Sequence, residues 1–198
     1  MLILASQSPR RQELLRAAGI EFRAVRPDGE PRAPGSARGR YADLVRRAAL
    51  AKALSVAQRE RGLILGADTI VVCGGQVMGK PAGKAEAREM LWALSDRWQS
   101  VYTGLALVCG SRHTVGYERT KVAFCRLSKK QIEWYVSTGE PMDKAGAYAI
   151  QGEGAALVRA IRGCYTNVIG LPLPRLMEML SRFREGSRSG DRAQRGGC

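Results

Sequence analysis

The chain has 198 residues, of which 45% are hydrophobic and 25% are charged. This composition is that of an ordinary globular domain, and it excludes a collagen-like or wholly disordered chain. No apolar run approaches the roughly 18 residues that a membrane span needs, and the first residues lack the basic region of a secretory signal. We therefore expect a soluble, cytoplasmic protein. The net charge of +14 points to anionic ligands, without separating nucleotides from nucleic acid or membrane surfaces.

Segments typical of strands and helices alternate along the chain. The expected strands are 2–5, 21–26, 63–73, 76–79, 100–109 and 114–127, and the expected helices are 9–18, 41–61, 84–94, 128–137 and 172–184. Because they interleave without an internal repeat, the predicted fold class is α/β with a mixed sheet. We expect a single domain over residues 1–184, followed by a polar, Gly-rich and disordered tail over residues 185–198.

The cysteines and the histidine do not suggest a site. The five cysteines are widely spaced and form no metal-binding pattern. His113 is the only histidine, and it lies in a polar segment over 110–114 that reads as a hairpin turn, so we expect a solvated loop residue. Any bound metal would then be held by carboxylates.

Charged side chains interrupt the apolar pattern in two helices. Arg10 and Arg11 fall in the first turn of the first helix, where free backbone N–H groups and the helix dipole favour an anion. Two solvated arginines are the alternative. Lys52 lies on the apolar stripe of the helix over 41–61, so it either extends past small neighbours to water or reaches an anion.

Asp68 interrupts the apolar strand over 63–73. A buried, unpaired carboxylate is costly, so Asp68 must be paired, protonated, bound to a metal or placed at a strand end. A structural pair with a basic neighbour and a place in a functional site both remain open. Lys80 follows a hairpin from the same strand and is a candidate neighbour. Several cations with few carboxylates, and no Walker-type loop, suit phosphate chemistry assisted by a divalent ion.

Five motifs occur in order between about residues 2 and 180: LASQSPRR (4–11), GADTIV (66–71), GKP (79–81), EPMDKAGAYAIQG (140–152) and GLPL (170–173). Together they closely resemble the Maf family of nucleoside triphosphate pyrophosphatases. The resemblance implies an elongated mixed sheet flanked by helices, in two lobes with a central cleft, similar to the inosine triphosphate pyrophosphatase fold. It also implies hydrolysis of a nucleoside triphosphate to the monophosphate and pyrophosphate with a divalent cation, usually Mg²⁺, with Mn²⁺ as the alternative.

The resemblance assigns roles to residues on the phosphate side of the site. Asp68 matches the proton acceptor that activates the attacking water, and it is also a candidate metal ligand. Arg11, Lys52 and Lys80 match basic residues around the triphosphate. Ser6 lies in the same phosphate-binding entry.

The resemblance also assigns a metal ligand and the residues that set base preference. Glu30 matches an acidic residue near the metal, with Asp28 as the alternative because the loop around it is divergent. Arg10, Thr69 and Gln151 fall where the family sets base preference. Their combination resembles the branch that acts on dTTP and UTP, rather than the branch that acts on 7-methyl-GTP.

One departure and two other functions complete the expectations. Ala149 stands where the family pattern has Gly, and it adjoins the loop that carries Gln151. The resemblance implies a nucleoside triphosphate substrate, homodimers and a link to septum formation, and it requires neither a membrane nor nucleic acid. A regulator that binds nucleotide or nucleic acid through its basic surface, without catalysis, is the alternative. A phosphatase that releases orthophosphate would need the same residues.

Overall fold

The computed structural model describes residues 1–29 and 39–190, with side-chain surroundings up to residue 185. The strands are β1 (Leu2–Ala5), β2 (Phe22–Ala24), β3 (Leu63–Cys73), β4 (Gln76–Met78), β5 (Trp98–Cys109), β6 (Arg112–Phe124) and β7 (Val158–Arg162). The α-helices are α1 (Pro9–Ala17), α2 (Tyr41–Ala57), α3 (Lys84–Leu94), α4 (Lys129–Ser137), α5 (Tyr165–Ile169) and α6 (Leu173–Gly190). Three 3₁₀ helices, η1 (Glu140–Asp143), η2 (Ala145–Ala147) and η3 (Gly152–Leu157), follow α4. Within the described ranges, no helix is both long and apolar enough to cross a membrane.

The structure differs from the sequence-based elements at several places. The helix α6 continues to Gly190, beyond its expected end at residue 184, while residues 191–198 lie outside the described part of the chain. His113 is exposed as predicted, but it belongs to β6, where it pairs with Val108. The turn therefore occupies only the residues between β5 and β6. The strand β7 and the helix α5 lie in a Gly-rich stretch where no element was predicted.

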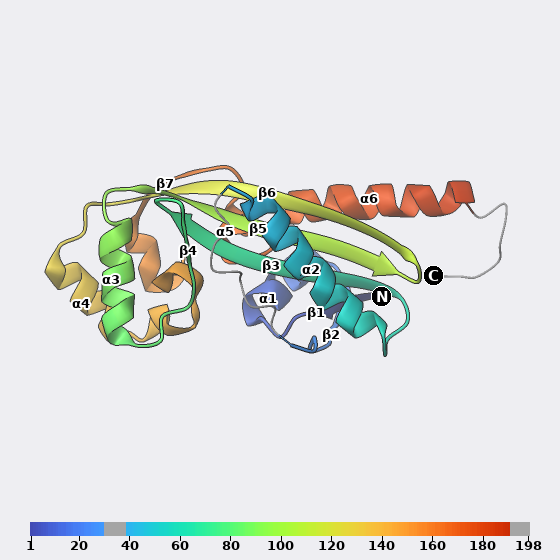
Figure 1. Cartoon of the computed structure of the whole chain (residues 1–198), viewed down its shortest axis with the longest axis horizontal. Helices are drawn as coiled ribbons and strands as arrows, with labels where there is room; N and C mark the ends of the chain where they lie inside the picture. Colours follow the sequence, from blue (N-terminus) through green and yellow to red (C-terminus); the bar gives the residue numbers. More distant parts are fainter. Residues whose placement is uncertain (30–38, 191–198) are drawn as a thin grey trace.

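The strands form one seven-stranded mixed sheet, which confirms the predicted fold class (Figure 1). Its order is β2-β1-β3-β5-β6-β7, and β4 pairs with β3 beside this path. The strand β1 is parallel to both β2 and β3, whereas the other pairs are antiparallel.

One edge of β3 changes partner half-way along its length. The strand β1 pairs with β3 up to Gly66, and β4 pairs with it from Val71 onward. Residues 67–70 therefore have no strand partner on this edge among the described residues, although β5 pairs with them on the other edge. The chain leaves the sheet at this gap after Ala5, which places Ser6 and the start of α1 beside Asp68 and Thr69.

The helix α2 covers one face of the sheet at very short range (Figure 1). A Cβ atom on Gly66 would lie 2.1 Å from the Ala49 carbonyl oxygen, and one on Gly104 would lie 2.1 Å from that of Val45. The two glycines therefore let the helix backbone rest directly on the strands. Asp68 pairs with Gly104 in the sheet and faces this helix, which brings it close to Lys52.

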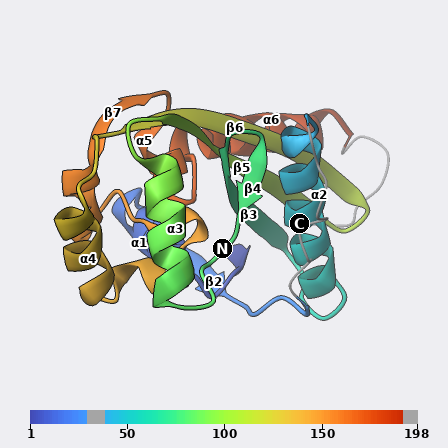
Figure 2. The ribbon, with the colours of Figure 1, turned by 60° about the vertical axis from the view of Figure 1, so that its left-hand side comes forward.

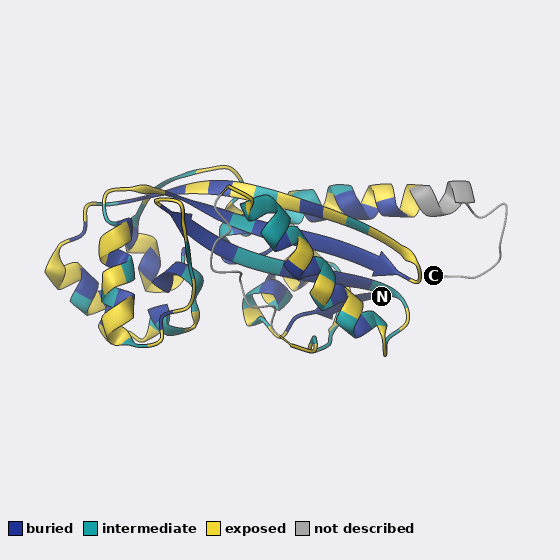
Figure 3. Ribbon diagram, in the orientation of Figure 1, coloured by how far each residue is buried: buried dark blue, intermediate teal, exposed yellow. Residues whose placement is uncertain are grey.

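The opposite face carries two separate hydrophobic clusters. One contains Leu65 and Ala67 of β3 and packs against α1, α5 and α6. The other contains Val71 and Cys73 of the same strand and packs against α3 and α4. Figure 2 shows the group formed by α3 and α4 standing apart from α2, and Figure 3 shows that the central strands are largely buried. We call the part around the first cluster, with α1, α5 and α6, the first lobe, and the part around the second cluster, with α3 and α4, the second lobe. Thr69 lies between the clusters, so the two lobes meet at a polar position.

Candidate functional site

The face of β3 that carries Asp68 holds a pair of opposite charges. Lys52 Nζ lies 2.6 Å from Asp68 Oδ1, and the two side chains are 13% and 21% exposed. The lysine therefore neither simply extends into water nor waits for an external anion, because Asp68 already provides its counter-charge. Within the described residues, the second oxygen of Asp68 accepts no hydrogen bond. This oxygen is open to a water molecule or a cation at the unpaired edge of β3.

The other face of β3 holds a cation among neutral oxygens. Arg11 is buried, and its guanidinium donates to Ser6 Oγ at 3.1 Å, Thr69 Oγ1 at 3.1 Å and the Gly170 carbonyl at 2.9 Å. No carboxylate pairs with it among the described residues. Burial lowers the pKa of Arg11, and the negative charge of Asp68 opposes this shift. An arginine remains charged under such conditions, so this position favours an anionic ligand.

Hydrogen bonds across the sheet hold Thr69 in place. Thr69 Oγ1 lies 3.0 Å from Thr103 Oγ1, which in turn lies 3.4 Å from the Asn167 carbonyl oxygen. The Asn167 amide donates to the Val101 carbonyl and to Thr120 Oγ1. This chain of neutral groups fills the polar position between the two clusters. It fixes Thr69, and through Thr69 it fixes the guanidinium of Arg11.

Arg10 differs from its neighbour Arg11 in both exposure and partner. Its guanidinium lies 3.5 Å from Asp143 Oδ2 of η1, so it joins the start of α1 to the other lobe. Lys144 Nζ also contacts Asp143, at 2.6 Å. Partial burial would raise the pKa of Asp143, but the Lys144 hydrogen bond and the charge of Arg10 outweigh it and lower the pKa.

The structure places Lys80 and Gln151 on exposed segments of the second lobe. Lys80 directly follows Gly79, whose carbonyl oxygen accepts a 2.9 Å hydrogen bond from the Gly146 amide. The described residues include no hydrogen bond or ion pair made by the side chain of Lys80 or Gln151. Lys52, rather than Lys80, is therefore the ion-pair partner of Asp68 in this conformation.

Three carboxylates are candidate metal ligands: Glu30, Asp28 and Asp68. The structure describes Asp28 and Asp68, and of these two Asp68 lies at the gap in β3. Glu30 lies outside the described residues. Asp28 forms an ion pair with Arg59 and its amide donates to Ser55 Oγ, which ties it to the end of α2. Among the residues that the structure describes, no three acidic, histidine or cysteine side chains gather. Asp68 still suits Mg²⁺, which binds through one or two carboxylates together with phosphate oxygens.

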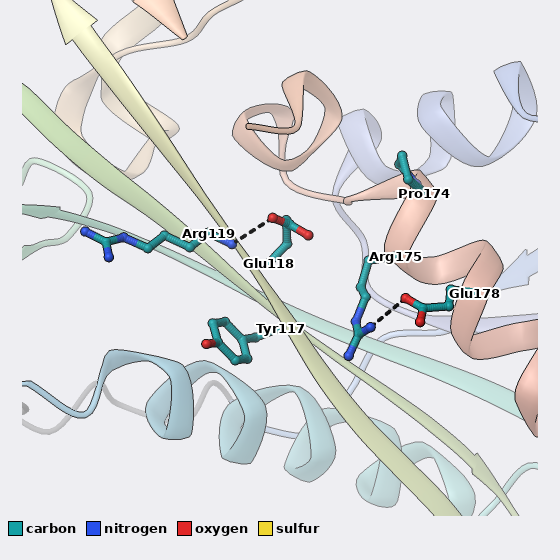
Figure 4. Close-up of a pocket in the computed structure, with 6 residues that line it drawn as sticks. All are labelled: Tyr117, Glu118, Arg119, Pro174, Arg175 and Glu178. Atoms are coloured by element: carbon teal, nitrogen blue, oxygen red, sulfur yellow. Dashed lines mark hydrogen bonds and ion pairs between the residues drawn. The ribbon is translucent and has the colours of Figure 1, made fainter. Parts of the chain in front are cut away.

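Two surface hollows lie elsewhere on the molecule, between β6 and α6. Their volumes are about 480 and 580 Å³. The smaller one is lined by Tyr117, Glu118, Arg119, Pro174, Arg175 and Glu178 (Figure 4). There, Arg175 is paired with Glu178 at 2.5 Å. We place the site at the gap in β3 instead, because that is where unlike charges and an uncompensated cation come together.

Comparison with known proteins identifies the family. The family model described as "Maf-like protein" matches residues 1–183. The chain belongs to the Maf family. Among its Maf relatives, a protein of Symbiobacterium thermophilum is 55% identical over 92% of this chain and 93% of its own length. A protein of Pelotomaculum thermopropionicum is 45% identical, over 92% and 96%.

Both of these Maf relatives are named dTTP/UTP pyrophosphatase. A solved nucleoside-triphosphatase, a dITP/XTP pyrophosphatase of Mycobacterium abscessus, is 19% identical to the chain. It covers 64% of this chain and 75% of its own, with a TM-score of 0.44. This structural similarity is too low to add to the assignment.

Sequence reasoning missed the residues of this Maf chain that hold Thr69, Arg11 and Arg10 in place by hydrogen bonds or ion pairs. Thr103 was detectable as a hydroxyl close to the apolar run that ends the strand β5. The Gly170 carbonyl has no side chain to reveal it, although it lies in the GLPL motif. Asp143 lies in the motif over 140–152, but only the fold shows that it meets Arg10.

Proposed function

We propose that this protein is a nucleoside triphosphate pyrophosphatase that cleaves the bond between the α- and β-phosphates of dTTP and UTP. The observation that supports this most directly is the arrangement at the gap in β3. Within the described residues, one oxygen of the Asp68 carboxylate pairs with Lys52, and a buried arginine nearby donates to neutral oxygens. A protein that only bound polyanions would gain nothing from a carboxylate at this position.

Asp68 is the general base in this proposal. Lys52 holds one oxygen of Asp68, and the other oxygen can orient a water molecule toward the α-phosphorus. The pairing also explains how a carboxylate survives between apolar residues of a central strand. When substrate binds, the same lysine can share its charge with a phosphate oxygen.

The cations near the gap would contact two parts of the substrate, the triphosphate and the nucleobase. Arg11, with Ser6 beside it, provides a positive and pre-arranged position for phosphate oxygens, and preorganised charge is a main source of catalysis in phosphoryl transfer. Lys80 would complete this group by reaching the leaving pyrophosphate. Arg10 and Gln151, one from each lobe, would contact the nucleobase of the substrate. The observed hydrogen bonds of Thr69 suggest that this residue acts by holding Arg11.

A divalent cation, most simply Mg²⁺, would be held by Asp68 and Glu30 together with substrate oxygens. When bound, such a cation neutralises charge that develops on the phosphate oxygens. A carboxamide such as Gln151 offers one donor and one acceptor to a pyrimidine edge. This supports the preference for dTTP and UTP.

Product analysis tests the proposal. The protein is incubated with Mg²⁺ and, separately, with dTTP, UTP, CTP, GTP, 7-methyl-GTP and ITP, and both pyrophosphate and orthophosphate are measured. We expect pyrophosphate and monophosphate from dTTP and UTP, and a loss of roughly a thousandfold in Asp68→Asn, within the range for removal of a general base.

Asp43→Asn is the matched control, because Asp43 also pairs with a basic residue of α2 but lies away from the gap. If orthophosphate were the product, the activity would be that of a phosphatase and not that of a pyrophosphatase. If no nucleotide were turned over, the basic surface would more simply serve a nucleotide- or nucleic-acid-binding regulator.

A further inference from the structure

The segment that carries Gln151 is attached to the rest of the protein at both of its ends. On one side, the Ala149 amide donates to the Tyr135 hydroxyl at 3.0 Å. On the other side, the amides of Glu153 and Gly154 each donate to the Glu140 carboxylate at 3.1 Å. Gln151 itself is exposed between these attachments. The loop therefore presents its amide side chain outward from a fixed base.

The two attachment points are joined to each other. The Tyr135 hydroxyl donates to Glu140 Oε1 at 2.8 Å, so one hydroxyl accepts from the loop and donates to the carboxylate. Burial raises the pKa of Tyr135 far above its ordinary value, so the hydroxyl keeps its proton. Because α4 supplies Tyr135 and η1 supplies Glu140, the loop is held by two different elements of the second lobe.

The fit between this pair and the loop leaves little free space. A Cβ atom on Gly152 would lie 2.5 Å from Glu140 Oε2, and Gly152 has a φ of +70°. A Cβ atom on Gly154 would lie 2.6 Å from the Tyr135 hydroxyl and 2.3 Å from the Ala149 carbonyl oxygen. Ala149 lacks a positive φ, so an alanine is accommodated there without backbone strain. The conformation of the loop is thus tied to the carboxylate and the phenol.

We propose that Glu140 and Tyr135 are positioning residues that set base preference by fixing the loop that carries Gln151. This inference rests on the proposed function, because it assumes that Gln151 meets the base of a nucleotide. Neither side chain needs to touch the substrate. Both are in the lobe of α3 and α4, across from Arg11 and the Lys52–Asp68 pair, so their replacement is expected to leave the phosphate side of the site intact.

The variants Glu140→Gln and Tyr135→Phe each remove part of this attachment without changing side-chain size. A carboxamide has a single acceptor oxygen, so it cannot accept from all three donors that the carboxylate serves. The phenyl ring of Tyr135→Phe offers no acceptor to the Ala149 amide. Glu133→Gln is the matched control, because Glu133 lies on α4 and pairs with Arg88, away from the loop.

The first readout is nucleotide selectivity, measured as kcat/KM for UTP divided by kcat/KM for GTP. We expect this ratio to fall roughly tenfold in Glu140→Gln and in Tyr135→Phe, the equivalent of one hydrogen bond, and to stay at the wild-type value in Glu133→Gln. Because both residues act through one loop, the double variant should lose no more selectivity than the more affected single variant. Adding Glu140→Gln to Gln151→Ala should likewise cause little further loss.

The second readout is amide hydrogen exchange, which does not depend on activity. Peptides that span residues 148–155 should exchange faster in Glu140→Gln, while peptides from β3 and β5 remain unchanged. Faster exchange with unaltered selectivity would reduce the pair to a purely structural role and overturn the proposal. Unchanged exchange would show that the pair does not hold the loop.

The failure of the proposed function gives a different pattern. If the wild-type protein hydrolysed no nucleotide, the selectivity ratio would not exist and the assignment of base preference would be wrong. Exchange over residues 148–155 would then still decide whether Glu140 and Tyr135 fix this loop.

Discussion

Asp68 and Thr69 are consecutive residues of β3, and because strand side chains alternate they face opposite sides of the sheet. On one side, Asp68 meets a lysine and forms a pair with no net charge. On the other side, Thr69 meets Arg11, whose guanidinium is surrounded by a hydroxyl pair and a carbonyl oxygen. In the part of the chain that the structure describes, one face therefore carries a balanced charge, and the other carries a cation without a paired carboxylate.

This difference separates two tasks that a hydrolase of phosphate anhydrides must perform. In the proposed mechanism, a base must be held in place before the substrate arrives, and Lys52 would hold Asp68 there. An anion must find positive charge that is not already neutralised, and Arg11 would provide that. A single residue could not serve both purposes, because a guanidinium paired with a carboxylate would attract phosphate less strongly. The alternation of the strand places the two functions one residue apart.

The largest expected effect comes from breaking the charged pair. In Lys52→Met, Asp68 loses the cation that holds one of its oxygens, so the carboxylate is no longer fixed for a water molecule. We expect kcat for UTP to fall roughly a hundredfold. Combining Lys52→Met with Asp68→Asn should cost little beyond Asp68→Asn alone, because residues that act as a unit are not additive. If the losses of kcat in the two single variants multiplied in the double variant, the pairing would be contradicted. Lys84→Met, on the surface of α3, serves as the control.

The next effect comes from changing the cation on the other face. Arg11→Lys keeps the charge but cannot donate to Ser6, Thr69 and Gly170 at once. We expect KM for UTP to rise by roughly tenfold or more, and the free energy of unfolding to fall by about 1–3 kcal/mol. Urea unfolding and steady-state kinetics measure the two quantities. Arg16→Lys on the exposed side of α1 should change neither, and an unaltered KM in Arg11→Lys would remove Arg11 from the phosphate site.

A smaller effect is expected from removing the hydroxyl of Thr103, which holds Arg11 through Thr69. Thr103 is fully buried, and its hydroxyl bonds to Thr69. Thr103→Val preserves the shape but removes this support, so we expect the free energy of unfolding to fall by about 1–2 kcal/mol. KM should change less than in Arg11→Lys. Thr114→Val on β6 is the control, and equal destabilisation in both variants would show that the buried hydroxyl has no special role.

The smallest effect concerns the ion pair of the partly buried Arg10. Because Asp143 is 70% exposed, Asp143→Asn should change stability at neutral pH by less than about 0.5 kcal/mol. The folded-state pKa of Asp143 is lowered, so its contribution is present above the ordinary pKa near 4 and is lost as pH falls through the lower folded value. Thermal unfolding between about pH 4 and 2 should therefore depend less on pH in Asp143→Asn. A steeper dependence would contradict the observed ion pairs.

The sequence predicted the parts of the site that depend on local pattern. A carboxylate inside an apolar strand and a lysine on an apolar helix stripe both break periodicity, and each was a candidate for that reason. Their pairing was not predicted, because it depends on how closely α2 lies on the sheet. The glycines at 66 and 104 carry that information, since a strand glycine often marks a close backbone approach.

Other features could not be read from the sequence. The Gly170 carbonyl that accepts from Arg11 has no side chain, and the link from Tyr135 through Glu140 to the loop at 149–154 joins segments that only the fold brings together. The 3₁₀ helices and β7 lie where glycines obscure periodicity. The end of α6 was placed too early because its last residues are polar and Gly-containing, although the helix continues through them.

The change of partner along β3 also bears on how this strand edge is protected from pairing with other strands. An unpaired strand edge exposes backbone donors and acceptors that can recruit a strand from another molecule. Here the open stretch covers only residues 67–70, and it is bounded by β1 at one end and β4 at the other. An incoming strand would collide with one of them before it could form a useful ladder. Residues 67–70 can thus lack a strand partner on this edge without offering a pairing site to strands of other polypeptides.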